Sequence, residues 1–243
     1  MGILRISTMR HLLLAAAFSA LLAAPAQAVV VIGFEGVNAT YPSTSYADIL
    51  SFYSGGTSSQ GTTGANLGAT FASNAVAVCL NALGGSCSNA SRGGLSVTSS
   101  QGGMGIGSGT STYFDFPSGF SFAIGFSYAV APGSVATISA YSGLGGNGAL
   151  LAPPLVLLPG SPGCAAYNAS RCPFGPGGYS FSGVAKSVVF TGQPGKVVWD
   201  DLTLGANDPQ SPVPEPAAWL SLMLGLASLT VLGRRQALPR SRD

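Results

Sequence analysis

Six carboxylates are the main candidates for acid–base chemistry in the central part of this chain. The only histidine, His11, lies near the N-terminus, so residues 29 to 212 contain no imidazole for a Ser/His/Asp or Cys/His arrangement or for a usual zinc site. A glycosidase-type pair of carboxyl groups, about 5 to 9.5 Å apart, remains possible. No spacing singles out such a pair, so no catalytic residue is predicted. The six are Glu35, Asp48, Asp115, Asp200, Asp201 and Asp208.

Asp200 is the most informative of these carboxylates. In a strand, alternation places Asp200 on the same face as Val198 and Leu202, which are expected to point inward. Burying an unpaired carboxylate costs several kcal/mol, so Asp200 needs a partner, either Lys196 or a hard cation. The alternative is that Asp200 and Asp201 end a strand at the solvent edge or cap a turn.

The last 32 residues carry three features in a fixed order. Pro214-Glu215-Pro216 precedes 17 uncharged, largely apolar residues, 217 to 233, which are followed by Arg234-Arg235. A helix over those residues would be roughly 25 Å long, slightly short of the ~30 Å hydrocarbon core but able to span it with modest thinning. The arginines, with the rest of the tail 234–243, are expected to stay in the cytoplasm.

The first 28 residues match a secretory signal peptide. Arg5 and Arg10 precede an apolar run over residues 12–24, and Ala26-Gln27-Ala28 has the small-x-small pattern that signal peptidase cuts. The run of about 13 residues is too short for the alternative, an N-terminal anchor, which needs about 17. The mature chain is therefore expected to begin at Val29.

The C-terminal order resembles the PEP-CTERM sorting signal of Gram-negative bacteria, whose Pro-Glu-Pro is recognised by exosortase. Residues 236–243 make a longer tail than is usual for that family. The resemblance implies export across the inner membrane, transient anchoring by the helix at 217–233, and processing to a cell-surface or extracellular form. It also implies a setting of exopolysaccharide and biofilm. The alternative is a plain C-terminal anchor.

The four cysteines form two close pairs, each with seven intervening residues. In an exported protein such spacing predicts local disulfides, which contribute about 2 to 3 kcal/mol each in the chain-entropy model. Three pairings are formally open. A metal or redox site is less favoured because the two-residue spacing is missing. The cysteines are Cys79, Cys87, Cys164 and Cys172.

The body between the targeting segments is slightly acidic. Its four cations are scattered, while a phosphate backbone is normally bound by clustered Lys and Arg, so nucleic acid is not an expected partner. With four cations and six carboxylates, residues 29–212 carry a net charge of −2. The cations are Arg92, Arg171, Lys186 and Lys196.

Glycine and proline recur every few residues in the body, and helical periodicity is nearly absent. This pattern predicts many short strands. Residues 120–130 alternate strictly, with Phe120, Phe122, Ile124 and Phe126 on one face. The fold class is therefore all-β, a jelly-roll-like β-sandwich over 29–207, with 208–216 as linker. Loops are expected at 54–68 and 99–111. Further strands are expected at 29–37, 69–80, 94–98, 112–116, 135–141, 155–158, 179–181, 185–190 and 196–204.

Short motifs in the body resemble the sandwich domain common among PEP-CTERM proteins. They are Gly33-Phe34-Glu35, Phe120-Ser121-Phe122, Phe181-Ser182-Gly183, Ala185-Lys186-Ser187-Val188 and the run from Trp199 to Gly205. The first and last strands are also similar to those of carbohydrate-binding jelly rolls. Those domains often hold a structural Ca²⁺ between an acidic residue near the first strand and an Asp near the last, which implies a possible calcium site at Glu35 and Asp200.

Two classes of function follow. The first is an exported, non-enzymatic surface or matrix protein that binds extracellular polysaccharide. The second is a carboxylate-dependent enzyme acting on polysaccharide, which the missing histidine and the few carboxylates disfavour. Exposed aromatic rings would stack on sugars, although most such residues belong to a core. The candidates are Tyr41, Tyr46, Tyr53, Tyr113, Tyr141, Tyr167, Tyr179 and Trp199, the last opposing the inward face of its strand.

Overall fold

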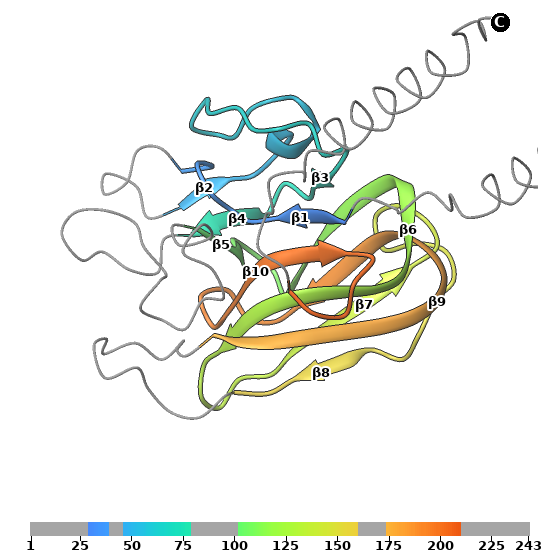
Figure 1. Cartoon of the computed structure of the whole chain (residues 1–243). Coiled ribbons are helices and arrows are strands. Elements are labelled where there is room, and N and C mark those ends of the chain that lie inside the picture. Colours follow the sequence, from blue (N-terminus) through green and yellow to red (C-terminus); the bar gives the residue numbers. More distant parts are fainter. Residues whose placement is uncertain (1–28, 39–45, 79–101, 160–173, 210–243) are drawn as a thin grey trace, which may run out of the picture.

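The computed structural model describes residues 29–38, 46–78, 102–159 and 174–209. The described part is all-β, with ten strands and one 3-10 turn, η1 at Phe52–Ser54 (Figure 1). The strands are β1 Val30–Ile32, β2 Tyr46–Asp48, β3 Thr70–Phe71, β4 Ala75–Val78, β5 Gly103–Ile106, β6 Ser111–Val130, β7 Ala136–Tyr141, β8 Leu155–Leu157, β9 Gly175–Thr191 and β10 Val197–Leu204.

All the strand pairs are antiparallel, and they join one sheet in the order β2-β4-β5-β10-β6-β9-β7-β8. Off this path, β1 pairs with β10, and β3 pairs with the first part of β6. The two longest strands, β6 and β9, run together through the middle of the sheet (Figure 1). This arrangement is consistent with the β-sandwich expected from the strand pattern.

Each of the two long strands, β6 and β9, covers two strands that the sequence predicts as separate. β6 covers the predicted strands 112–116 and 120–130, and β9 covers 179–181 and 185–190. The β6–β9 register shifts between Asp115 and Phe120 and again between Ser121 and Ala123. Bulges therefore accommodate the turn-like residues between the predicted strands, and the ladder continues past them.

The sequence missed β2 and β5. β5 lies inside the window 99–111, which was predicted as a loop because it is rich in glycine and serine. All four of its residues are buried between β4 and β10. The predicted strand 69–80 is instead two strands, β3 and β4. The predicted loop 54–68 is confirmed as turns that include one isolated bridge, Thr57 to Thr63.

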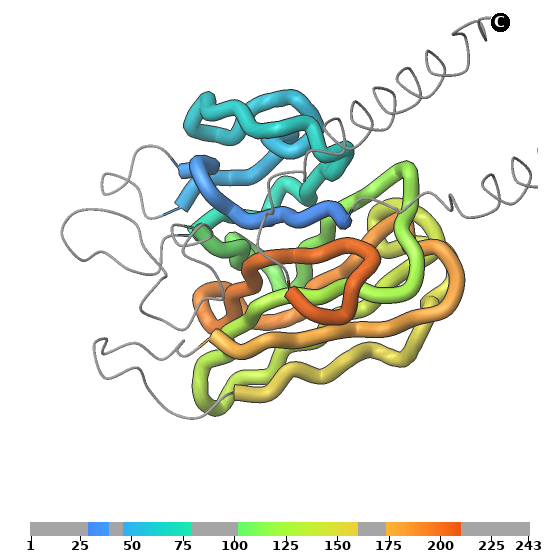
Figure 2. Tube along the Cα trace, viewed as in Figure 1, coloured from blue at the N-terminus to red at the C-terminus, as the bar shows by residue number. Residues whose placement is uncertain are grey.

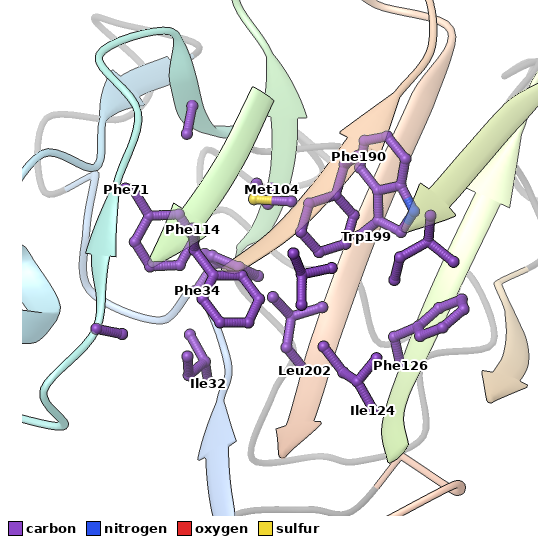
Figure 3. Close-up of a cluster of buried hydrophobic side chains, with 14 of the residues drawn as sticks. Ile32, Phe34, Phe71, Met104, Phe114, Ile124, Phe126, Phe190, Trp199 and Leu202 are labelled. Carbon is purple, nitrogen blue, oxygen red and sulfur yellow. The ribbon is translucent and has the colours of Figure 1, made fainter. Parts of the chain in front are cut away.

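One hydrophobic core draws residues from most of the sheet, and Figure 3 shows its centre. Trp199 is fully buried there, with its ring centroid 5.0 Å from that of Phe190 in an edge-on arrangement. Aromatic pairs with this geometry add about 0.5 to 1.5 kcal/mol beyond the area that they bury. The expectation that Trp199 opposes the inward face is wrong. A chain of ring contacts also links Phe34, Phe71 and Phe114 across the core.

Several predicted features lie outside the described residues. These are the signal peptide with its cleavage residues Ala26 and Ala28, all four cysteines, the predicted strand 94–98, and the sorting segment with Pro214, Glu215, Pro216, Arg234 and Arg235. Within the part of the chain that the structure describes, no helix has the length and apolar character needed to cross a membrane.

Candidate functional site

A bulge in the middle of β10 sets the positions of the two adjacent aspartates. The β10–β6 register shifts between Asp200 and Thr203, and Asp201 adopts a left-handed backbone conformation with φ 52°. The extra residue reverses the alternation of the strand: Trp199 belongs to the core before the bulge, and Leu202 belongs to it afterwards. The predicted common face of Val198, Asp200 and Leu202 is therefore wrong.

Asp200 and Asp201 are both buried, each only 1% exposed. Asp200 Oδ1 accepts a hydrogen bond from the backbone amide of Asp201 at 2.8 Å. Oδ2 of Asp201 accepts one from the Ser127 hydroxyl at 3.1 Å, and the Thr203 hydroxyl donates to the Asp201 carbonyl at 3.0 Å. The alternative of a solvent-exposed strand end is therefore wrong, because the pair lies inside a strand whose eight residues are all buried.

Glu35 follows β1 and meets the start of β5. The Gly102 amide donates to Glu35 Oε1 at 3.3 Å. A Cβ at Gly102 would lie 2.0 Å from the Phe34 carbonyl oxygen, so only glycine allows this close approach of the two backbones. Glu35 is thereby held beside β5, the neighbour of β10.

Tyr53 connects the two acidic segments. Its side chain is buried in η1, and its hydroxyl donates a hydrogen bond to the Gly33 carbonyl. Burial raises the pKa of the Tyr53 phenol well above its usual value, and the negative charges of Asp200 and then Glu35 raise it further. Both carboxylates therefore act on the pKa of the same phenol. We call Glu35, Tyr53 and Asp200 the carboxylate cluster.

Glu35 and Asp200 thus both act on the pKa of Tyr53, and a cation site held by the two carboxylates stays a prediction. The oxygen donors of the carboxylate cluster suit Ca²⁺, which takes six to eight oxygens from carboxylates and carbonyls. Among the described residues, however, no three His, Cys, Asp or Glu side chains are grouped as a metal site. Backbone oxygens would have to complete the coordination. Lys196, the other suggested partner of Asp200, is exposed before β10.

No motif in the sequence indicates that Tyr53 belongs to this site. It was one of eight aromatic candidates for sugar stacking, and its burial excludes that role. Tyr179 is also buried, while Tyr113 and Tyr141 are half-buried. Tyr46 is 57% exposed, and Tyr41 and Tyr167 lie outside the described residues.

A second candidate site is a pocket of about 380 Å³ at the bend of β6. Its wall is formed by Val29 and Val30 at the start of β1, by residues 116 and 118–122 of β6, and by Leu204 and Gly205 at the end of β10. Every described residue that lines the pocket is uncharged. The polar groups of this wall are the Ser118 and Ser121 hydroxyls and the backbone.

Phe122 lines this pocket, and both its backbone conformation and its exposure are unusual for a phenylalanine. Its φ is 81°, in the left-handed region, and its side chain is 63% exposed. The alternation in residues 120–130 predicted a core position for Phe122, and this is wrong. The β6–β9 ladder pairs Ser121 with Val184 and Ala123 with Ser180, so it skips Phe122 and rotates the ring out of the sheet face. We call this site the Phe122 pocket.

Comparison of the chain with protein-family models, with curated proteins and with solved structures gives no match.

Proposed function

We propose that this chain is an exported, non-enzymatic surface or extracellular matrix protein of a Gram-negative bacterium that binds a neutral glycan in the Phe122 pocket. The observation that carries the proposal is the exposed ring of Phe122, whose backbone is in the left-handed region, on a pocket in which every described lining residue is uncharged. The signal peptide and the PEP-CTERM-like end support the export and the exopolysaccharide setting.

The chemistry of the pocket suits a sugar ring. An aromatic face attracts the apolar C–H face of a pyranose, and the serine hydroxyls with the backbone at the bulge offer hydrogen bonds to its rim. The absence of charge from the lining favours a neutral ligand over a uronic acid or a phosphorylated sugar. The volume lies at the lower end of the range for ligand pockets, which suits one or two sugar units.

The backbone of Phe122 adds a second argument. A bulky residue in the left-handed region costs about 1 to 3 kcal/mol and persists only where its surroundings enforce it. An exposed ring recovers little of that cost through burial. Such strain is concentrated at functional sites, which supports Phe122 as a ligand-contacting residue.

A pull-down of the purified protein with a panel of neutral and acidic exopolysaccharides tests this proposal. Phe122→Ala should reduce binding of the neutral polymer at least tenfold. Tyr46→Ala is the matched control, because Tyr46 is a similarly exposed aromatic on β2, outside the pocket lining. Equal loss in both variants, or none in Phe122→Ala, contradicts the assignment.

The alternative, a carboxylate-dependent polysaccharide-active enzyme, would use Glu35 and Asp200, the carboxylates that act on the pKa of Tyr53. The burial of Asp200 argues against it, since a catalytic carboxyl group must reach the substrate. A reducing-sugar assay beside the pull-down separates the two functions. Turnover that is lost in Glu35→Gln or Asp200→Asn would establish the enzyme instead.

We also propose a structural Ca²⁺ at the carboxylate cluster, held by Glu35 and Asp200 with backbone carbonyl oxygens. A bound cation would offset the negative charge of the buried Asp200 and of the half-buried Glu35, and would join the segment after β1 to β10. It would supply structural stabilisation rather than catalysis.

We assign the body to a jelly-roll-like sandwich, with signal peptidase and exosortase as export partners and the helix at 217–233 as transient membrane anchor. Mass spectrometry of the native C-terminus tests the maturation. An end near Glu215 supports processing, and an intact Arg235 contradicts it.

A further inference from the structure

We propose that residues 205–209, which we call the exit strap, are docked on the outer face of β6 and β9, and that this docking restricts access to the sorting motif. The restriction of access depends on the proposed exosortase processing. The docking itself does not. Figure 2 shows the chain turning back across the sheet after β10.

The strap begins with a turn that is bonded to the sheet. Gly205 has φ 86°, a conformation that suits glycine, and its amide donates to the Ala123 carbonyl of β6 at 2.9 Å. The chain then crosses to β9, where the Asn207 carbonyl oxygen lies over Gly178, and returns over Gly125 of β6 with Asp208 and Pro209.

The contact is closer than any side chain would permit. A Cβ at Gly178 would lie 2.1 Å from the Asn207 carbonyl oxygen, and one at Gly125 would lie 2.4 Å from the Asp208 backbone. Gly125 and Gly178 are direct register partners in the β6–β9 ladder. Together they form a notch into which the backbone of the strap fits.

The local backbone gives no other reason for these two glycines. Neither has the positive φ that would demand glycine, and glycine inside a strand costs roughly 0.5 to 1 kcal/mol relative to alanine. Both lie on the outer face, because the core residues next to them, Ile124 and Tyr179, point the other way. Close approach of the strap is therefore the role that the structure assigns to them.

The docked strap shortens the tether between the body and the sorting motif. Pro209 and Pro214 are five residues apart, which spans at most about 18 Å of extended chain. Release of residues 206–209 would add roughly 14 Å. A membrane-bound protease must approach Pro214-Glu215-Pro216 beside the folded body, so the short tether hinders it and release of the strap gives it room.

Digestion of the full-length protein, in detergent, with an endoproteinase that cuts before aspartate tests the docking. Cleavage at the bond between Asn207 and Asp208 should be slow in the parent and at least tenfold faster in Gly178→Ala. Gly175→Ala is the matched control, because Gly175 lies in the same strand with no atom near its added Cβ. It should be cut at the parental rate, and equal rates in all three proteins overturn the docking.

Cleavage before Asp115, which lies inside the β6 ladder, reports unfolding of the sheet. If Gly178→Ala increases this cleavage too, Asn207→Gly combined with Pro209→Gly leaves the sheet sequence intact and decides the question. That variant should be cut faster at Asp208 alone, and an unchanged rate overturns the docking.

Pulse-chase of the same proteins in the producing bacterium tests the restriction of access. Gly178→Ala should be processed at least twofold faster than Gly175→Ala, and an equal or slower rate overturns it. If neither protein is processed at all, the proposed sorting fails while the digestion result still stands.

Discussion

The Ser127 hydroxyl donates a hydrogen bond of 3.1 Å to Oδ2 of Asp201, and this bond joins β6 to the bulge of β10. Both side chains are buried, so the bond lies away from competing water. A hydrogen bond to a charged group contributes about 1.5 to 3 kcal/mol. The bond therefore helps to hold the bulge that places Trp199 and Leu202 in the same core.

We expect Ser127→Ala to lower the free energy of unfolding by about 1 to 3 kcal/mol, because Asp201 loses a buried hydroxyl donor. Urea denaturation monitored by Trp fluorescence measures the change. Ser180→Ala on β9 is the control, since Ser180 is exposed, and its effect should stay within about 0.5 kcal/mol. Equal midpoints for the two variants would show that the bond contributes nothing to stability.

The buried Tyr53 phenol predicts alkaline sensitivity. Its folded pKa is raised above the unfolded value of about 10, so its contribution to stability is fully present below pH 10 and is lost as the pH rises through the folded pKa. The melting temperature should therefore fall between pH 9 and 11. Tyr53→Phe should reduce this fall, although it starts lower at pH 8 because the bond to the Gly33 carbonyl is lost. Tyr46→Phe, a change at an exposed tyrosine, should follow the parent curve; a parental slope in Tyr53→Phe would reject this explanation.

Two substitutions at Phe122 separate the strain of its backbone from the function of its ring. Phe122→Gly relieves the left-handed conformation, whereas Phe122→Ala keeps it, so the glycine variant should be about 1 kcal/mol more stable than the alanine variant. Thermal melts compare the two. Both should lose glycan binding equally, because both lack the ring. A glycine variant no more stable than the alanine variant would mean that the conformation is not strained.

Calcium should raise the melting temperature of the protein, and EDTA should lower it, if the carboxylate cluster holds the proposed ion. Glu35→Gln should abolish the response, while Asp48→Asn, a change at the end of β2, should retain it. Scanning calorimetry on EDTA-treated and calcium-restored protein gives the measurement. The site should be abandoned when EDTA leaves the melting temperature unchanged and calcium adds nothing afterwards.

The strand class and much of the core could be predicted without coordinates. Alternation in residues 120–130 correctly indicated Phe120, Ile124 and Phe126 as core residues, because the period of a strand is a local property of the backbone. The joining of β6 across its bend was missed, because continuity depends on a partner strand, β9, that lies far away in the sequence.

For the two sites, too, the sequence predicted some features and the tertiary structure decided the others. Sequence alone proposed Glu35 and Asp200 as members of one site, through their resemblance to known strands, and it excluded imidazole chemistry from the body by composition. Tyr53, the outward turn of Phe122 and the burial of Asp201 required the tertiary structure. Each results from a bulge or from a contact between distant segments, and a shift of one residue in register exchanges the two faces of a strand. Residue types thus limit the chemistry available to this protein, while long-range pairing decides which of those residues meet.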